Sequence, residues 1–170
     1  QTAGIAVGGR DPGNVANVEE YDGTSWSEVS DIPIGTERGG GAGIQTSALS
    51  FGGRSGAGTS TVAETFEYDG TNWTDGGDLP VVNKNQFGFG TQTAAVGAGG
   101  YNTALVAEAY TYNGTAWADD GNNNTSRKYG SPSGTSQNYG NMGGGDPGGD
   151  SNSALMEQYD GTSWTELADL

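Results

Sequence analysis

Short stretches with the two-residue period of a β-strand recur along the chain, separated by glycine-rich turns. In the clearest copy, residues 39–44 and 46–51 form two segments of small and apolar residues, and residues 62–68 alternate roughly between two kinds of side chain. Such alternation is typical of a strand with two different faces. The pattern therefore predicts three short strands here, followed by a fourth around Trp73, with a polar loop at residues 54–61.

The third and fourth strands of this copy are joined by a motif that occurs four times. The motif is Tyr, Asp or Asn, Gly, Thr, any residue, Trp, and its copies are residues 21–26, 68–73, 112–117 and 159–164. The tryptophans are 47, 44 and 47 residues apart, and a glycine pair keeps step with them at residues 8–9, 52–53, 99–100 and 143–144. Self-similarity at a constant period indicates a repeat architecture. We expect one domain, 1–170, with repeats at about 1–33, 34–80, 81–124 and 125–170.

The Asp-Gly or Asn-Gly step in each motif predicts a tight hairpin. A type I′ turn requires positive φ at both central residues, and these dipeptides supply it at low cost. Pro80 then ends the second repeat, because proline cannot continue a β-ladder. The motif is thus interpreted as a turn with an aromatic packing anchor rather than as a ligand site.

The repeated aromatic residues predict how the sheets associate. A lone four-stranded sheet would leave its aromatic side chains in water, whereas neighbouring sheets stacked around an axis would bury them. Glycine and alanine suit the crowded strands near the axis. We therefore predict an all-β fold, a β-propeller of four-stranded antiparallel blades. The expected blade anchors are Trp26, Trp73, Trp117, Trp164, Tyr21, Tyr68, Tyr112 and Tyr159.

A glycine pair, a Tyr and then a Trp five residues later, repeated about every 45 residues, resembles the kelch motif. The resemblance covers nearly the whole chain and implies a kelch-like β-propeller, with the glycine pair ending the second strand of each blade and the Trp on the fourth. Residues 43–53 and 90–96 are also similar to the Gly/Ala/Thr-rich kelch-like repeats of phage structural proteins, especially those of marine phages and cyanophages. That similarity implies a virion or extracellular location.

The first repeat is incomplete. Gln1 aligns with Gln45 and Gln92, so the first of about four blades lacks its own first strand. Three arrangements remain open: a four-bladed ring with one short blade, a segment of a larger propeller or repeat array, or a blade completed by a neighbouring subunit.

Composition narrows the chemistry. The 170 residues include 21 acidic and 6 basic residues, no His and no Cys, for a formal net charge of -15. Leu, Ile, Val and Phe make up only about 14% of the chain, which would indicate disorder if the repeats were ignored. The missing residue types exclude disulfides, a thiolate nucleophile, a Ser-His-Asp triad and the usual zinc sites. The charge disfavours nucleic acid and anionic lipid, and no apolar run approaches the roughly 20 residues of a membrane span.

The acidic loops are the remaining candidates for metal binding. Residues 119–124 and 146–150 offer oxygen ligands, but neither has the spacing of a known calcium loop. We expect no metal and no cofactor. No carboxylate pair stands out from the repeat pattern for glycoside hydrolysis, so we expect no enzymatic activity.

The basic residues occupy only two repeat positions. Two directly follow a glycine pair and four lie just before a first strand, which places them all at the same end of antiparallel blades. They are Arg10, Arg38, Arg54, Lys84, Arg127 and Lys128. Either they balance the charges of Asp11, Glu37, Asp146 and Asp150, or they mark the end of the propeller that recognises a partner.

These observations predict a non-enzymatic structural or binding module of a virion or surface appendage, such as a tail fibre, a decoration or a receptor-binding protein. The expected partners are other structural subunits, further copies of this chain, and a host surface glycan or receptor. The alternatives are a secreted, lectin-like carbohydrate-binding module and a carbohydrate-active enzyme domain.

Overall fold

The computed structural model describes residues 2–56, 60–149 and 151–170, and these form β-strands and loops with no helix among them. The first sheet contains β1 (Gly4–Arg10), β2 (Asn14–Tyr21) and β3 (Trp26–Val29), in that order. A small sheet joins β4 (Thr36–Glu37), β7 (Arg54–Ser55) and β8 (Ser60–Thr61). No helix long and apolar enough to cross a membrane occurs in these ranges.

The other three repeats each form a four-stranded antiparallel sheet. The second contains β5 (Gly40–Ile44), β6 (Ser47–Phe51), β9 (Thr65–Tyr68) and β10 (Trp73–Asp75). The third contains β11 (Phe87–Thr91), β12 (Ala94–Ala98), β13 (Glu108–Tyr112) and β14 (Trp117–Asn122). The fourth contains β15 (Ser131–Ser136), β16 (Tyr139–Gly143), β17 (Met156–Tyr159) and β18 (Trp164–Leu167). The all-β class and the four-stranded antiparallel sheets are confirmed.

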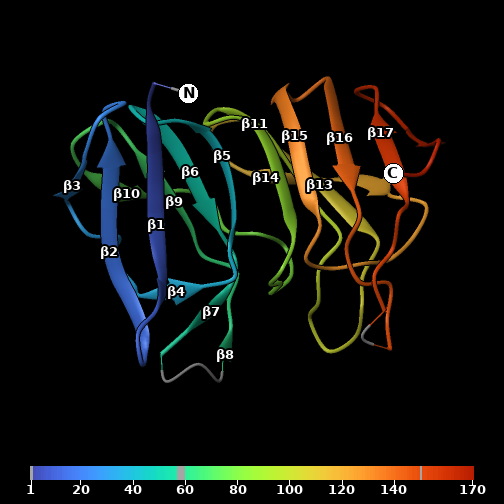
Figure 1. Ribbon diagram of the computed structural model, residues 1–170, viewed down its shortest axis with the longest axis horizontal. Helices are drawn as coiled ribbons and strands as arrows, with labels where there is room; N and C mark the ends of the chain where they lie inside the picture. The colour runs from blue at the N-terminus through green and yellow to red at the C-terminus, as the bar shows by residue number, and fades with distance from the viewer. Residues whose placement is uncertain (1, 57–59, 150) are drawn as a thin grey trace.

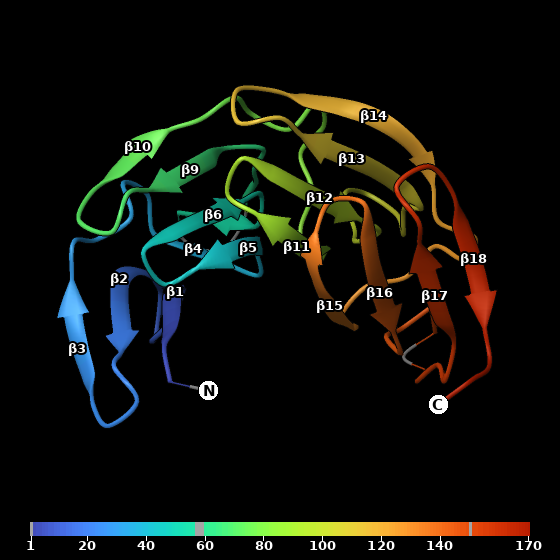
Figure 2. The same cartoon turned by 90° about the horizontal axis from the view of Figure 1, so that it is seen from above.

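The four large sheets, called blades 1 to 4 in chain order, stand side by side (Figure 1) and follow an arc when seen from above (Figure 2). Seen from above, β1, β5, β11 and β15 are the innermost strands, whereas β3, β10, β14 and β18 are the outermost (Figure 2). The two ends of the chain face each other across an opening between blades 1 and 4. The arrangement is propeller-like, but it is an open arc and not a closed four-bladed ring.

Within the residues that the structure describes, the core consists of three clusters, one between each pair of successive blades. Val18 and Ile32 of blade 1 pack with Phe66 of blade 2, and Leu49 of blade 2 packs with Tyr110 of blade 3. The third cluster joins the Phe-rich β11 to blade 4. Because each blade buries its apolar residues only against a neighbour, the repeats stabilise one another.

Three of the four predicted tryptophan anchors are buried between blades. Trp73, Trp117 and Trp164 are at most 9% exposed. The Trp73 indole donates a hydrogen bond to the Ser30 carbonyl on the preceding blade. The prediction is wrong for Trp26, which is 54% exposed. Its ring centre lies 5.2 Å from that of Tyr21 in its own motif, and among the described residues Trp26 belongs to none of the buried core clusters.

A hydrogen bond from the motif tyrosine to a carboxylate accompanies each of these three interfaces. Tyr68 donates to Glu20 at 2.9 Å and Tyr112 to Glu67 at 2.5 Å. Burial, reinforced by the accepting carboxylate, raises the pKa of Tyr68 to about 12 and that of Tyr112 to about 12. In the last interface Tyr159 donates to the carboxylate of Asp120, and its pKa is raised for the same reasons.

The motif turns differ from the type I′ prediction. Tyr68 pairs directly with Trp73, so the loop contains four residues, and within it Gly70 has positive φ whereas Asp69 does not. Asp69 instead accepts hydrogen bonds from the backbone N–H groups of Thr71 and Asn72. These two side-chain hydrogen bonds stabilise the turn, so it needs no second residue with positive φ. The same bonds lower the pKa of the Asp69 carboxyl.

Two further details differ from expectation. In the fourth repeat the conformation of the glycine pair falls on Gly144 and Gly145, one residue later than predicted, with φ of 65° and 100° that match the 62° and 104° of Gly52 and Gly53. The expected loop at 54–61 contributes β7 and β8 to the small sheet.

Candidate recognition site

Five of the six predicted basic residues gather at one place in the molecule. Glu37, whose side chain is 9% exposed, lies 3.6 Å from Arg10, 3.8 Å from Arg38 and 3.5 Å from Arg54. Lys84 and Lys128 complete this set, which we call the cationic group. Because the single carboxylate of Glu37 is shared among three arginines, positive charge exceeds negative charge around it.

Lys84 lies close to three other members of the cationic group, Arg38, Arg54 and Lys128. Its ammonium donates a hydrogen bond to the hydroxyl of Thr61 and lies 5.0 Å from the centre of the Tyr101 ring. Burial lowers the pKa of Lys84, and repulsion from Arg54, Arg38 and Lys128 lowers it further. A negatively charged ligand would relieve that repulsion.

Two tyrosines that sequence reasoning missed lie among these cations. The Lys128 ammonium is 5.6 Å from the Tyr101 ring and 5.2 Å from the Tyr129 ring. The Tyr129 hydroxyl accepts a hydrogen bond from Arg38, and Tyr129 is 55% exposed. Lys128 also forms an ion pair with Asp146, at 3.2 Å. The sequence signal was available, because Tyr129 directly follows Lys128.

The backbone around the cationic group is unusual at equivalent positions of three repeats. Arg38, Asn85 and Tyr129 have φ of 63°, 58° and 64°, a conformation that side chains other than Gly and Asn seldom adopt. The N–H of Asn85 donates to the carbonyl of Arg38, and the N–H of Tyr129 donates to the carbonyl of Asn85. The three blades thereby hold these residues in a fixed row.

Arg127 does not belong to the cationic group, and its predicted place on an exposed face is wrong. It is fully buried and forms an ion pair with Glu157 at 2.7 Å, while donating a second hydrogen bond to the Met142 carbonyl. Glu157 occupies the position where the other complete blades carry Phe66 and Tyr110. Glu157, a carboxylate at a repeat position that is aromatic in blades 2 and 3, was the sequence signal that a buried cation would be needed beside it.

The acidic loops are already engaged. Asp119 accepts the N–H of Gly121, and Asp146 accepts the N–H of Gly148, the main cause of its lowered pKa. In the ranges that the structure describes, no group of three or more acidic side chains is placed to hold a metal ion. Asp150, one of the predicted charge-balancing residues, lies outside those ranges.

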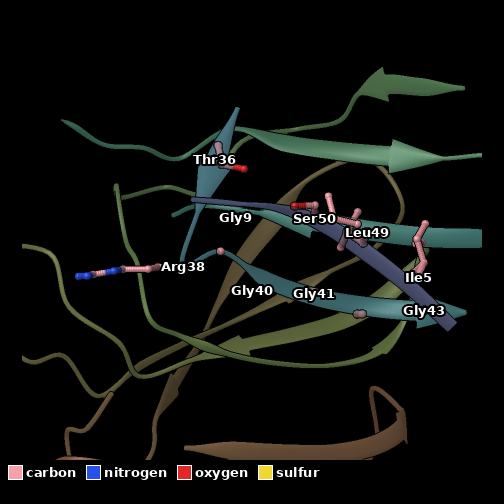
Figure 3. A pocket seen from close by; sticks show the side chains of 13 residues that line it. Ile5, Gly9, Thr36, Arg38, Gly40, Gly41, Gly43, Leu49 and Ser50 are labelled. Atoms are coloured by element: carbon pink, nitrogen blue, oxygen red, sulfur yellow. The ribbon is translucent and has the colours of Figure 1, made fainter. Parts of the chain in front are cut away.

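A cavity of about 400 Å³ lies between β1 of blade 1 and the inner strands β5 and β6 of blade 2, beside the cationic group. Ile5 and Leu49 line it, together with the glycines of β5 (Figure 3). Arg38 stands at its margin and extends away from the other labelled side chains. The cavity and the cationic group are therefore adjacent but chemically distinct.

Comparisons with known proteins bear on the fold alone. No family model and no curated protein matches the sequence. Among solved structures, one titled "Structure of YjhT" superposes with a TM-score of 0.75 at 12% sequence identity, covering 91% of this chain and 60% of that one. The chain therefore spans less than two thirds of the structure it matches, and the likeness supports the propeller-like arrangement of blades.

Proposed function

We propose that this chain is a non-enzymatic binding and structural module with kelch-like repeats, located in a virion or a surface appendage. It contacts an anionic group on a neighbouring subunit or a host receptor through the cationic group. The observation that carries the proposal is the concentration of Arg38, Arg54, Lys84 and Lys128 at one place in a chain whose formal net charge is -15. An excess of positive charge there is suited to a partner carrying carboxylate, sulfate or phosphate.

The geometry supports a binding role in two further ways. Equivalent residues of three blades are held in a strained backbone conformation by hydrogen bonds between blades, so the site is organised before any ligand arrives. The chain also lacks His and Cys, the residue types most used as general bases and nucleophiles.

The test is binding to an array of sulfated, carboxylated and neutral glycans, together with pull-down of structural subunits from purified particles. The double variant Arg38→Gln/Lys84→Gln should lose at least tenfold in affinity for the anionic partner, and wild-type binding should weaken as salt rises. Thr71→Ala, in a motif turn away from the cationic group, should bind like wild type. Binding that is independent of salt and of both cations would contradict the proposal.

A lectin-like module is the second candidate, favoured by the exposed Tyr129 ring beside Lys128 and Arg38. An aromatic ring flanked by hydrogen-bond donors suits the apolar face and the hydroxyls of a sugar. Tyr129→Ala would then abolish glycan binding while leaving subunit contacts intact. Equal loss of both would favour the first candidate.

A further inference from the structure

Lys84 and Lys128 are the two lysines of the chain, and they occupy equivalent positions in the third and fourth repeats. Each directly precedes the non-glycine residue of its repeat that has positive φ, as Glu37 does in the second repeat. One backbone position therefore carries a carboxylate once and an ammonium twice. The two ammonium groups have different surroundings, and that difference bears on their chemistry.

The cross-strand partners of this position set Lys84 apart. The residue at this position pairs in each repeat with the residue that follows a glycine pair: Glu37 with Arg54, Lys84 with Tyr101, and Lys128 with Asp146. The first and last of these pairs join opposite charges, at 3.5 Å and 3.2 Å. Of the three, Lys84 is the one that faces a neutral ring.

Neutral groups and other cations surround the Lys84 ammonium. It donates a hydrogen bond to the Thr61 hydroxyl at 2.9 Å and lies 5.0 Å from the centre of the Tyr101 ring. Thr61 pairs with Arg54 in the small sheet, which places that guanidinium close to Lys84. In residues 2–56, 60–149 and 151–170, no acidic side chain forms an ion pair with Lys84.

These surroundings favour the uncharged amine of Lys84 over its ammonium. Burial lowers the pKa of Lys84, and repulsion from Arg54, Arg38 and Lys128 lowers it further. A lysine that is partly desolvated and lies next to other cations is an activated nucleophile. Lys128 differs, because its ammonium forms an ion pair with the Asp146 carboxylate.

The neighbouring cations also provide an anchor for an anionic ligand. Lys84, Arg54 and Lys128 are each half-buried, so a ligand can reach all three from solvent. The Lys128 ammonium lies 5.6 Å from the same Tyr101 ring that Lys84 approaches. An anion held by Arg54 and Lys128 therefore lies close to the Lys84 amine.

We propose that Lys84 is a carbonyl-reactive lysine, which forms an imine with small aldehydes or ketones that carry a phosphate or carboxylate group. The ammonium first gives up a proton to solvent, and the amine nitrogen then forms a bond to the carbonyl carbon. Loss of the carbonyl oxygen as water leaves a C=N double bond. Arg54 and Lys128 hold the anionic group of the ligand and so place its carbonyl at the amine.

The imine site rests on the proposed function in one respect, since its ligand is held by the cationic group. It goes beyond that function by adding a covalent bond at one residue. The chain binds one ligand without turnover, so it remains a binding module.

The first test uses the wild-type chain of 170 residues. The chain is incubated with pyridoxal 5′-phosphate at neutral pH, the imine is reduced with borohydride, and peptide mapping by mass spectrometry locates the adduct. The adduct should be at least tenfold more abundant at Lys84 than at Lys128, because a lower pKa leaves more uncharged amine. Pyridoxal has the same aldehyde without the phosphate, and as the matched control it should label Lys84 at least tenfold less.

Two variants test the role of the neighbouring cations. Arg54→Gln removes one cation that holds the anionic group, so labelling of Lys84 by pyridoxal 5′-phosphate should fall at least threefold. Thr71→Ala lies in a motif turn outside the cationic group and should be labelled like wild type. A thermal melt checks that both variants fold.

Three results would overturn the imine site. Lys84 and Lys128 could be labelled equally, the two aldehydes could label Lys84 equally, or Arg54→Gln could be labelled like wild type. The comparisons of lysines and of aldehydes use the wild-type chain, so they decide the matter even if Arg54→Gln does not fold.

The imine site and the proposed function fail in different ways. Equal labelling of the two lysines, together with salt-dependent binding of an anionic partner, would remove the imine site and leave the proposed function standing. Binding of partners that is independent of salt and of the cations would contradict the proposed function, whatever the labelling of Lys84.

Discussion

Trp26 and Trp117 occupy the same position in the same motif, yet one is 54% exposed and the other 8%. Each stacks on the tyrosine of its own motif, at 5.2 Å and 5.0 Å between ring centres. The difference lies in what stands in front of the pair. Trp117 also packs at 4.7 Å on Phe51 of blade 2 and donates a hydrogen bond to Thr65, whereas Trp26 belongs to blade 1, before which the structure describes no further blade.

The comparison shows that the Tyr–Trp pair of the motif is buried only where a second surface packs against it. That second surface is the apolar face of the preceding blade, which Leu49 and Phe51 provide for Trp117. At the far end of the arc, blade 4 carries Ser133 and Asn141 where blade 3 carries Phe89 and Val96. The two ends of the arc therefore differ, since one presents an aromatic pair and the other a polar face.

The largest effect expected from this comparison is on stability. Trp117→Ala should lower the free energy of unfolding by about 3–5 kcal/mol, because it removes a buried indole and leaves a cavity between blades 2 and 3. Trp26→Ala should cost less than about 1 kcal/mol, since its ring is more than half exposed. Urea unfolding of the two variants, followed by circular dichroism, measures both values. Equal costs would mean that Trp26 is covered in solution by something the arc does not include.

The interface between blades 3 and 4 can be tested through its buried ion pair. Arg127→Met should cost about 3 kcal/mol, because it leaves the carboxylate of Glu157 buried without its cation. The double variant Arg127→Met/Glu157→Leu should recover much of that loss, since removing both charges removes the uncompensated one.

Lys128→Met is the matched control for this ion pair, because the side chains of Lys128 and Asp146 are 20% and 12% exposed, whereas those of Arg127 and Glu157 are 0% and 1% exposed, and Asp146 also accepts a backbone N–H. It should change the unfolding free energy by less than about 1 kcal/mol. If Lys128→Met lowered the free energy of unfolding as much as Arg127→Met does, the greater burial of the Arg127–Glu157 pair would not explain its larger effect.

The parts of the fold that repeat were predictable, and the parts that depend on neighbours were not. Four copies of one pattern indicated the blades, and the alternation in residues 62–68 located β9 to within three residues. The two-residue strands β7 and β8 were missed, since so short a strand shows no period. Trp26 was misplaced because its burial depends on a neighbouring blade and not on the residues of its own motif.

The candidate site divides in the same way. The repeat positions of the basic residues correctly brought five of them together, because equivalent positions lie at the same end of every blade. Arg127 was misassigned because its exposure is set by Glu157, thirty residues away, and not by its place in the repeat. Tyr101 was missed because the sequence reasoning followed charge alone, although Tyr101 directly follows its glycine pair, as Arg10 and Arg54 follow theirs.

The smallest effect concerns the tyrosine–carboxylate hydrogen bonds, which accompany the three closed interfaces. Tyr68 and Tyr112 both have a pKa raised to about 12 from the ordinary 10, so the folded state holds their protons more tightly than the unfolded state does. Their contribution to stability is therefore complete below pH 10 and is lost as the pH rises from 10 towards 12. Tyr68→Phe should cost about 1 kcal/mol at pH 8 and should flatten the loss of stability in that window. Tyr21→Phe, in the copy of the motif whose tryptophan is exposed, is the matched control. Urea midpoints measured from pH 8 to pH 11.5 for the three chains test this, and a wild-type profile flat across the window would contradict it.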